Sequence, residues 1–217
     1  MRERAIDTNN ATAVIQGFGN VGSYAALELH QFGLKVIAIS DHTGALYDKN
    51  GLDIPALMRH AGLHGSIAGF SNELHFDPDQ ILTLRCDVLV PAAMERVIDA
   101  RVAENLKCRV LAEGANGPTT PDADLVLEKR QDEIFLIPDI LCNSGGVVVS
   151  YFEWVQDLQQ LFWEEEEVTR REYHILDRAF DQMVMRSKAD NVTHRTAAMA
   201  IGVEKVRAAK NTRGLFP

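Results

Sequence analysis

The segment Gly17-Phe-Gly-Asn-Val-Gly22 combines residue types and spacing that suit a phosphate-binding loop. In the pattern G-x-G-x-x-G, the first glycine permits a tight turn, the second lets the backbone approach a pyrophosphate, and the third lets a helix pack closely on a sheet. Free N–H groups at the start of that helix would face the phosphates. The alternative is a loop of this shape on a fold that binds no nucleotide. We expect the loop to contact a dinucleotide through Gly17, Phe18, Gly19, Asn20, Val21 and Gly22.

An acidic residue, Asp41, follows the loop at about the 20-residue spacing where a carboxylate accepts hydrogen bonds from the adenosine ribose. This position favours NAD as the cofactor. In the alternative interpretation, Asp41 only caps the turn Asp-His-Thr-Gly that begins with it. His42 could meet a 2′-phosphate, so NADP stays open.

Three further segments rich in small residues follow predicted strands, namely residues 91–93, 113–118 and 138–146. Open α/β sheets bind their ligands at the carboxyl ends of the strands. Asn116 and Asn143, in two of these segments, offer both a donor and an acceptor, which suits a carboxamide or ribose hydroxyls. Both could instead only stabilise left-handed turns beside glycine.

The elements that position these loops alternate between strands and helices. Short apolar runs predict strands over 12–16, 35–40, 87–90, 109–112 and 134–137, with helices over 53–60, 77–84 and 95–105. A helix also follows Gly22, with an apolar face of Val21, Ala25, Leu29 and Phe32, and ends at Gly33. This order predicts a Rossmann-type α/β fold, with a doubly wound, mostly parallel sheet covered on both faces.

The character of the sequence changes after Gly146, and strand signals disappear from residue 151 onwards. Helical spacing indicates a C-terminal helical tail of two or three helices, and the acidic run 164–167 suits a solvated face near a helix start. We expect a dinucleotide-binding domain over 12–150 and C-terminal helices over 151–217. The helical spacing is found in two sets of residues of the tail: Tyr173, Leu176, Phe180, Met183 and Val184, and Thr196, Met199, Ala200, Val203 and Val206.

Composition narrows the classes of function. The chain has 217 residues and a formal net charge of −9, which argues against binding to nucleic acid or membrane surfaces. Three scattered cysteines predict reduced thiols in a cytoplasmic protein. No signal peptide and no transmembrane run are evident. Because histidines and cysteines do not cluster, we expect no metal site.

Four motifs together carry a family resemblance: AVIQGFGNVG, CDVLVPAAMERVI, LAEGANGPTTPDAD and PDILCNSGGVVVSYFEWVQ. In this order and spacing they closely resemble the C-terminal half of glutamate dehydrogenases, within the Glu/Leu/Phe/Val dehydrogenase family. The resemblance runs from about residue 12 to residue 217. It implies oxidative deamination of L-glutamate to 2-oxoglutarate and ammonia, with NAD or NADP as the acceptor.

The resemblance also implies roles for single residues. Ala92 and Ala93 match the loop beside the adenosine side of the cofactor, Asn116 the asparagine near the nicotinamide ribose, and Asn143 the one near the carboxamide. Gly17, Gly19, Gly22 and Asp41 match the pyrophosphate loop and the acidic position of the second strand. Val147 and Ser150 match positions that touch the side chain of glutamate.

One part of the family pattern has no counterpart here: the glycine-rich lysine motif and the catalytic aspartate of the N-terminal domain. We therefore expect no catalytic residue in this chain, no activity alone, and glutamate binding only together with an N-terminal catalytic domain. Two other interpretations stay open, a non-enzymatic NAD-binding sensor or regulatory module, and a fragment that folds but binds nothing. The apolar faces of the tail predict a homo-oligomer formed through it.

Overall fold

The structure is a computed structural model that describes residues 6–71 and 74–214. Residues 215–217, with which the family resemblance ends, lie outside this range. Contacts within the chain divide it into two compact units, Met1–Leu136 and Ile137–Pro217. The domain limits expected from the sequence, 12–150 and 151–217, stay a prediction.

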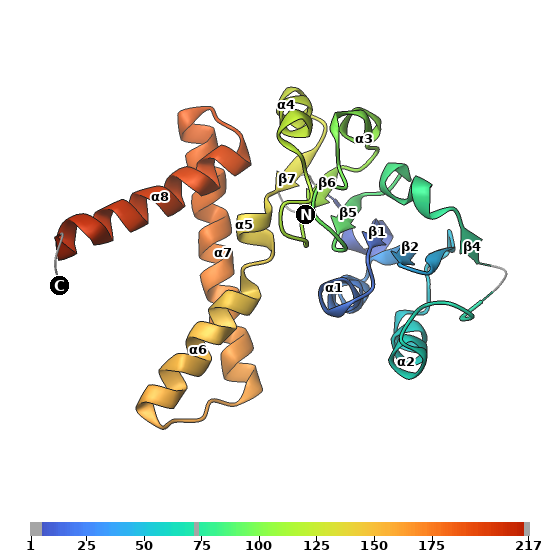
Figure 1. Cartoon of the computed structure of the whole chain (residues 1–217), viewed down its shortest axis with the longest axis horizontal. Helices are drawn as coiled ribbons and strands as arrows, with labels where there is room; N and C mark the ends of the chain where they lie inside the picture. The colour runs from blue at the N-terminus through green and yellow to red at the C-terminus, as the bar shows by residue number, and fades with distance from the viewer. Residues whose placement is uncertain (1–5, 72–73, 215–217) are drawn as a thin grey trace. The chain divides into compact units, whose positions relative to one another are not determined.

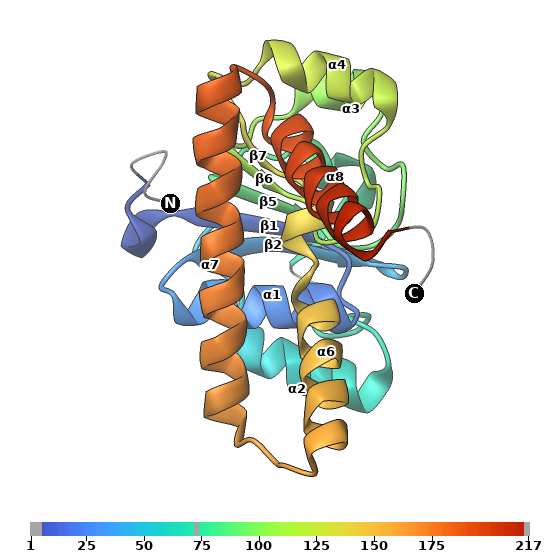
Figure 2. The ribbon, with the colours of Figure 1, turned by 90° about the vertical axis from the view of Figure 1, so that its left-hand side faces the viewer.

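The first unit is built on a seven-stranded sheet with the order β4-β3-β2-β1-β5-β6-β7. The pairs β1–β2, β1–β5 and β5–β6 are parallel, whereas β3 pairs antiparallel with both β2 and β4. The mostly parallel sheet expected from the sequence is thereby confirmed, with an antiparallel edge formed by β3 and β4. Figure 2 shows β2, β1, β5, β6 and β7 side by side in this sheet. The strands are β1 Thr12–Gln16, β2 Lys35–Asp41, β3 Gly44–Tyr47, β4 His75–Phe76, β5 Val88–Pro91, β6 Val110–Ala112 and β7 Phe135–Ile137.

Helices cover both faces of this sheet, as in other doubly wound folds. In Figure 1, α1 (Asn20–Gln31) and α2 (Ile54–His64) lie on one side, and α3 (Ala100–Asn105) and α4 (Pro121–Lys129) lie on the other. The short 3₁₀ helices η2 (Thr8–Asn10) and η3 (Pro78–Thr83) also belong to this unit. The Rossmann-type α/β fold is confirmed.

The hydrophobic core on the α3–α4 side of the sheet joins strands to helices. Val14, Leu89 and Leu111 lie on three adjacent parallel strands and are completely buried. The same cluster includes Ile81 of η3, Ala103 of α3, Leu106 just after α3, and Ala123 and Leu127 of α4. Burial of such side chains stabilises the folded state by about 25 cal/mol per Å² of apolar surface removed from water. This cluster therefore holds in place the strands that position the loops.

Side-chain caps explain why several helices start where they do. Asp53 accepts a hydrogen bond from the Ala56 N–H at 2.9 Å, and Asp77 accepts one from the Asp79 N–H at 3.0 Å. A proline follows each cap, at a position where its missing N–H costs nothing. The predicted helix starts at 53 and 77 are confirmed, although the second element is a 3₁₀ helix.

The predicted helix over 95–105 is wrong in its first half, because α3 begins at Ala100 with Asp99 as its cap. Residues 95 and 96 instead form a turn, with Arg96 at a φ of 57°, and Ile98 pairs with a distant segment. The Ile98 N–H donates to the Pro118 carbonyl at 2.9 Å, and the Ile98 carbonyl accepts from the Thr120 N–H at 2.9 Å. This non-local pairing outweighs local helix propensity.

The predicted buried face of α1 is also wrong. Gly22 and Ala26 are buried, whereas Val21 and Phe32 are more than half exposed. The helix lies close to the sheet, so small residues occupy the contact and the larger apolar residues lie beside or outside it. The helix α4 and the strands β3 and β4 were not predicted at all.

The second unit is helical, which confirms the prediction of two or three helices in the tail. A short helix α5 (Asp139–Cys142) precedes three long ones, α6 (Gly145–Gln159), α7 (Glu165–Asp190) and α8 (His194–Arg213). Figure 2 shows α7 running beside α6 and α8, and it packs against both. The acidic run does start a helix, since Glu164 is the N-cap residue of α7.

Packing inside this unit is uneven. Met183 and Val184 of α7 and Ala197 of α8 are buried, but Met199, Val203 and Val206 on α8 are exposed. Thus the apolar spacing predicted for α7 includes buried positions, whereas that of α8 lies largely on an exposed face.

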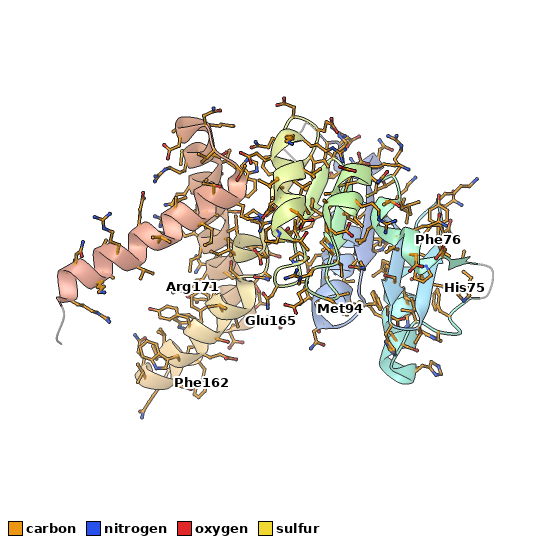
Figure 3. All side chains as sticks on the ribbon, turned by 45° about the horizontal axis from the view of Figure 1, so that its top comes forward. His75, Phe76, Met94, Phe162, Glu165 and Arg171 are labelled. Carbon is orange, nitrogen blue, oxygen red and sulfur yellow. The ribbon has the colours of Figure 1, made fainter. Side chains whose placement is uncertain are left out.

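The connection between α6 and α7 carries an exposed aromatic residue. Figure 3 shows Phe162 in this loop, where it is 95% exposed. Its neighbour Trp163 is anchored, because the ring contacts Phe152 at 5.5 Å between centroids and the Arg171 guanidinium lies 4.3 Å from the ring centroid.

In residues 6–71 and 74–214, no helix is both long and apolar enough to span a membrane.

Candidate cofactor-binding site

The glycine loop lies where the strand order of the sheet reverses. From β1 the chain goes by way of α1 to β2 on one side, and β5 occupies the other side of β1. This is the switch point at which open α/β sheets bind ligands. The Gly17 N–H donates to the Ser40 carbonyl at 2.8 Å, and the Ala92 N–H donates to the Gln16 carbonyl at 2.7 Å. These bonds bring the loop, the end of β2 and residues 91–93 together.

Two of the three glycines are required by the fold itself. Gly17 has a φ of 97°, and a Cβ atom there would lie 2.7 Å from the Ala92 carbonyl oxygen. A Cβ atom at Gly22 would lie 1.9 Å from the Gly17 carbonyl oxygen. No larger residue fits at either position without movement of the backbone.

The middle glycine is different, because a Cβ atom at Gly19 would have no atom within 4 Å. Gly19 is the N-cap residue of α1 and provides no side chain to cap the helix. The first N–H groups of α1 therefore open onto space that the fold leaves unfilled. A helix N-terminus with this access favours an anion, and the cradle fits the pyrophosphate of a dinucleotide.

The carboxylate of Asp41 is held by three donors within the protein. Oδ1 accepts from the N–H and the hydroxyl of Thr43, at 2.7 and 2.5 Å, and Oδ2 accepts from the Ile67 N–H at 2.8 Å. Burial, the largest influence, raises the pKa of Asp41, but the bonds from Thr43 and Ile67 and the nearby His42 together outweigh it and lower the pKa. The turn cap considered from the sequence is therefore present, and the ribose contact stays a prediction.

The loops after β5 and β6 meet beside the glycine loop. The Ala115 N–H donates to the Pro91 carbonyl at 2.9 Å. A Cβ atom at Gly114 would lie 3.3 Å from side-chain atoms of Ala92, Val21 and Val90. Hence three of the predicted segments, 17–22, 91–93 and 113–118, are brought together in one place.

The outer residues of these loops face solvent. Ala93 and Asn116 are exposed, as is Met94, which Figure 3 labels in the loop after β5. The buried anchors below them hold these loops in place beside the glycine loop.

The remaining predicted site residues lie in the helical unit. Asn143 ends α5, and its N–H donates to the Asp139 carbonyl at 3.1 Å. Val147 and Ser150 lie one turn apart on α6 and are both exposed. The Asp139 carboxylate accepts from Arg195 at 3.2 Å, which ties this segment to α8.

One polar residue in the first unit was not singled out from the sequence. Glu113, directly after β6, is fully buried, and its carboxylate accepts a hydrogen bond from the Thr119 hydroxyl. A charged residue between a buried strand and a glycine was the available signal, since carboxylates are almost never fully buried unless paired.

The sequence comparison decides the family. The model of the Glutamate/Leucine/Phenylalanine/Valine dehydrogenase family matches residues 1–214. The chain belongs to this family. The resemblance to the C-terminal half of glutamate dehydrogenases, first drawn from four motifs, is thereby confirmed.

Two curated relatives of this dehydrogenase-family chain are named glutamate dehydrogenases. It is 43% identical to the glutamate dehydrogenase of Thermotoga maritima, over 98% of this chain and 51% of the relative. It is 46% identical to glutamate dehydrogenase A2 of Halobacterium salinarum, over 97% of this chain and 50% of that protein. The chain thus spans about half the length of the curated relatives it matches.

Solved structures of the family agree in fold. A hetero-hexameric glutamate dehydrogenase from Thermus thermophilus matches with a TM-score of 0.90 and 32% identity, over 100% of this chain and 50% of that one. The glutamate dehydrogenase of Peptoniphilus asaccharolyticus matches with a TM-score of 0.81 and 34% identity, over 99% of this chain and 50% of that one.

Proposed function

We propose that this chain is the cofactor-binding half of an NAD(P)-dependent glutamate dehydrogenase. The observation that carries the proposal is the unfilled space at Gly19, at the N-terminus of α1 and at the switch point of the sheet. The relatives from Thermotoga maritima and Halobacterium salinarum, both named glutamate dehydrogenases, support the choice of reaction.

Each predicted residue has a role in this proposal. The N–H groups from Asn20 onwards bind the pyrophosphate, and Asp41 accepts from the adenosine ribose, which favours NAD over NADP. Ala92 and Ala93 leave room for the adenosine side. Asn116 and Asn143 hold the nicotinamide ribose and the carboxamide. A cofactor held by these residues would supply the hydride acceptor for oxidation at the Cα atom of the amino acid.

The substrate side is only partly supplied by this chain. Val147 and Ser150 would contact the side chain of glutamate. Oxidation at Cα also needs a base, and two substrate carboxylates need positive charge. We assign these groups to the other half of the enzyme, so the chain alone is proposed to bind cofactor without turnover.

Two measurements on the full chain test this proposal. Fluorescence titration with NADH should show saturable binding, and the absence of binding would contradict it. Glutamate-dependent NADH formation should be absent with the chain alone. It should appear when the half of the Thermotoga maritima relative outside the matched region is added. Binding without such complementation would favour a non-enzymatic sensor or regulatory module.

We further propose that copies of the chain associate through the helical tail. The exposed Met199, Val203 and Val206 on α8 support this, since exposed apolar surfaces favour association. Light scattering at high concentration should detect a species larger than a monomer, and Val203→Glu should reduce it. A strictly monomeric chain would contradict the proposal. We also propose a cytoplasmic location for the chain, as expected from its three scattered cysteines.

A further inference from the structure

Glu113 is a fully buried carboxylate that the proposed chemistry does not use. It directly follows β6, and the hydroxyl of Thr119 donates a hydrogen bond to its Oε1 atom. Burial of a carboxylate is costly unless hydrogen bonds compensate. The bond to Thr119 joins the two ends of the loop 113–119, which contains Asn116.

The first arm of this loop is anchored to the cofactor-loop residues. The Ala115 N–H donates to the Pro91 carbonyl at 2.9 Å, and Gly114 lies against Val21 and Ala92. A shift of this arm would therefore move residues that border the glycine loop.

The second arm is anchored to residues 96–98. The Arg96 N–H donates to the Gly117 carbonyl at 2.8 Å, and Thr119 forms a bridge with Ile98. Gly117, with a φ of 54°, makes the turn between the arms. Asn116 is exposed at this turn, so its position depends on how the two arms are joined.

We propose that Glu113 is a positioning residue for the cofactor. Through Thr119, its carboxylate fixes the loop 113–119 so that Asn116 is presented to the nicotinamide ribose. This inference rests on the proposed cofactor-binding function. It adds that the geometry of Asn116 is set from inside the fold by a buried carboxylate and a hydroxyl.

The test compares two adjacent threonines in the full chain. Thr119→Val removes the hydroxyl that reaches Glu113, whereas Thr120→Val removes one that caps α4 and donates to the Ile98 carbonyl. Both should lower the thermal midpoint. Only Thr119→Val should weaken NADH binding, by about tenfold, the order expected for one hydrogen bond to a charged group. Thr119→Ser, which keeps the hydroxyl, should restore affinity.

A double-mutant cycle with Asn116 separates positioning from general stability. In an Asn116→Ala background, Thr119→Val should cause no further loss of NADH affinity. If Thr119→Val does not fold, Glu113→Gln replaces it in the cycle, with a loss of a few fold in the same direction. Unchanged affinity in Thr119→Val, or an equal loss in the Asn116→Ala background, would overturn the inference. Failure of the unchanged chain to bind NADH would instead overturn the proposed function.

Discussion

The carbonyl oxygen of Gly17 lies 1.9 Å from the position that a Cβ atom at Gly22 would take. The turn that leaves β1 is therefore in direct contact with the first turn of α1. Replacing Gly22 by alanine forces one of these backbones to move. We expect Gly22→Ala to lower the free energy of unfolding by about 1–3 kcal/mol or more, as overpacking does.

Denaturant unfolding of Gly22→Ala measures this loss, and Gly62→Ala in α2 is the matched control. A Cβ atom at Gly62 would have no atom within 4 Å. That substitution should instead stabilise the chain by about 0.5–1 kcal/mol, because alanine favours the helix. Equal midpoints for the two variants would show that the contact between the turn and the helix is not close.

Asp41 is expected to serve both the turn and the cofactor. Asp41→Asn keeps an acceptor but removes the charge, so the bonds from Thr43 and Ile67 weaken and the free energy of unfolding should fall by about 1–2 kcal/mol. If the carboxylate also binds the ribose, the preference for NADH over NADPH should fall in the same variant.

The ratio of the two dissociation constants tests that role. Thr43→Val is the control, because it removes one donor to Asp41 and leaves the carboxylate in place. It should lower stability while keeping the ratio. An unchanged ratio in Asp41→Asn would mean that Asp41 acts only as a turn cap.

Asp87 should make stability depend on acid pH. Burial, the largest influence, raises its pKa, but bonds from the Thr12 N–H at 2.9 Å, from Arg109 at 3.2 Å and from the Thr12 hydroxyl outweigh it, so the pKa is lowered. Because the folded pKa lies below the unfolded value of about 3.9, the contribution is present above that value and disappears as pH falls through the folded pKa.

Unfolding of the unchanged chain and of Asp87→Asn, followed against pH, checks this sign. Near neutral pH the variant should be less stable by about 1–3 kcal/mol, the range for hydrogen bonds to a charged group. The difference should narrow below about pH 4, because there the carboxyl of the unfolded chain takes up a proton while the folded carboxyl, with its lowered pKa, is still ionised. A difference that widens in acid would contradict the assigned direction.

The three cysteines should differ in reactivity. Burial raises the pKa of the Cys108 thiol to about 12 and also raises that of Cys86, whose neighbours Cys108 and Asp87 add to the effect. Cys142 is only half-buried. Because the thiolate is the reactive form, titration of the native chain with a disulfide reagent should modify Cys142 first. Rapid modification of all three thiols before unfolding would contradict this.

Five of the strands, β1, β2, β5, β6 and β7, could be predicted from the sequence because they are short apolar runs, most of which end at glycine, proline or aspartate. The helix α4 was missed because Thr-Thr-Pro-Asp resembles a turn, whereas Thr120 in fact caps a helix that begins at Pro121. The buried face of α1 was misassigned because periodicity follows large apolar residues, and close approach to the sheet selects Gly22 and Ala26.

The candidate site was predictable where one local pattern defines it, as in the glycine loop. The role of Glu113 was not, because its burial depends on Thr119 and on the pairing of Ile98 with a distant segment. The same pairing shortened α3. Such non-local contacts leave no periodic signal in the sequence.

Binding of NADH to Gly19→Ala is the most direct test of the central claim, that the space at the N-terminus of α1 receives a pyrophosphate. A Cβ atom there meets no atom of the fold, so the variant should lose at most about 1 kcal/mol at the helix cap. The account predicts that the unchanged chain and the Gly62→Ala control bind NADH, while Gly19→Ala binds at least about tenfold more weakly with a nearly unchanged thermal midpoint. Equal affinity in Gly19→Ala, or no binding by the unchanged chain, would contradict it.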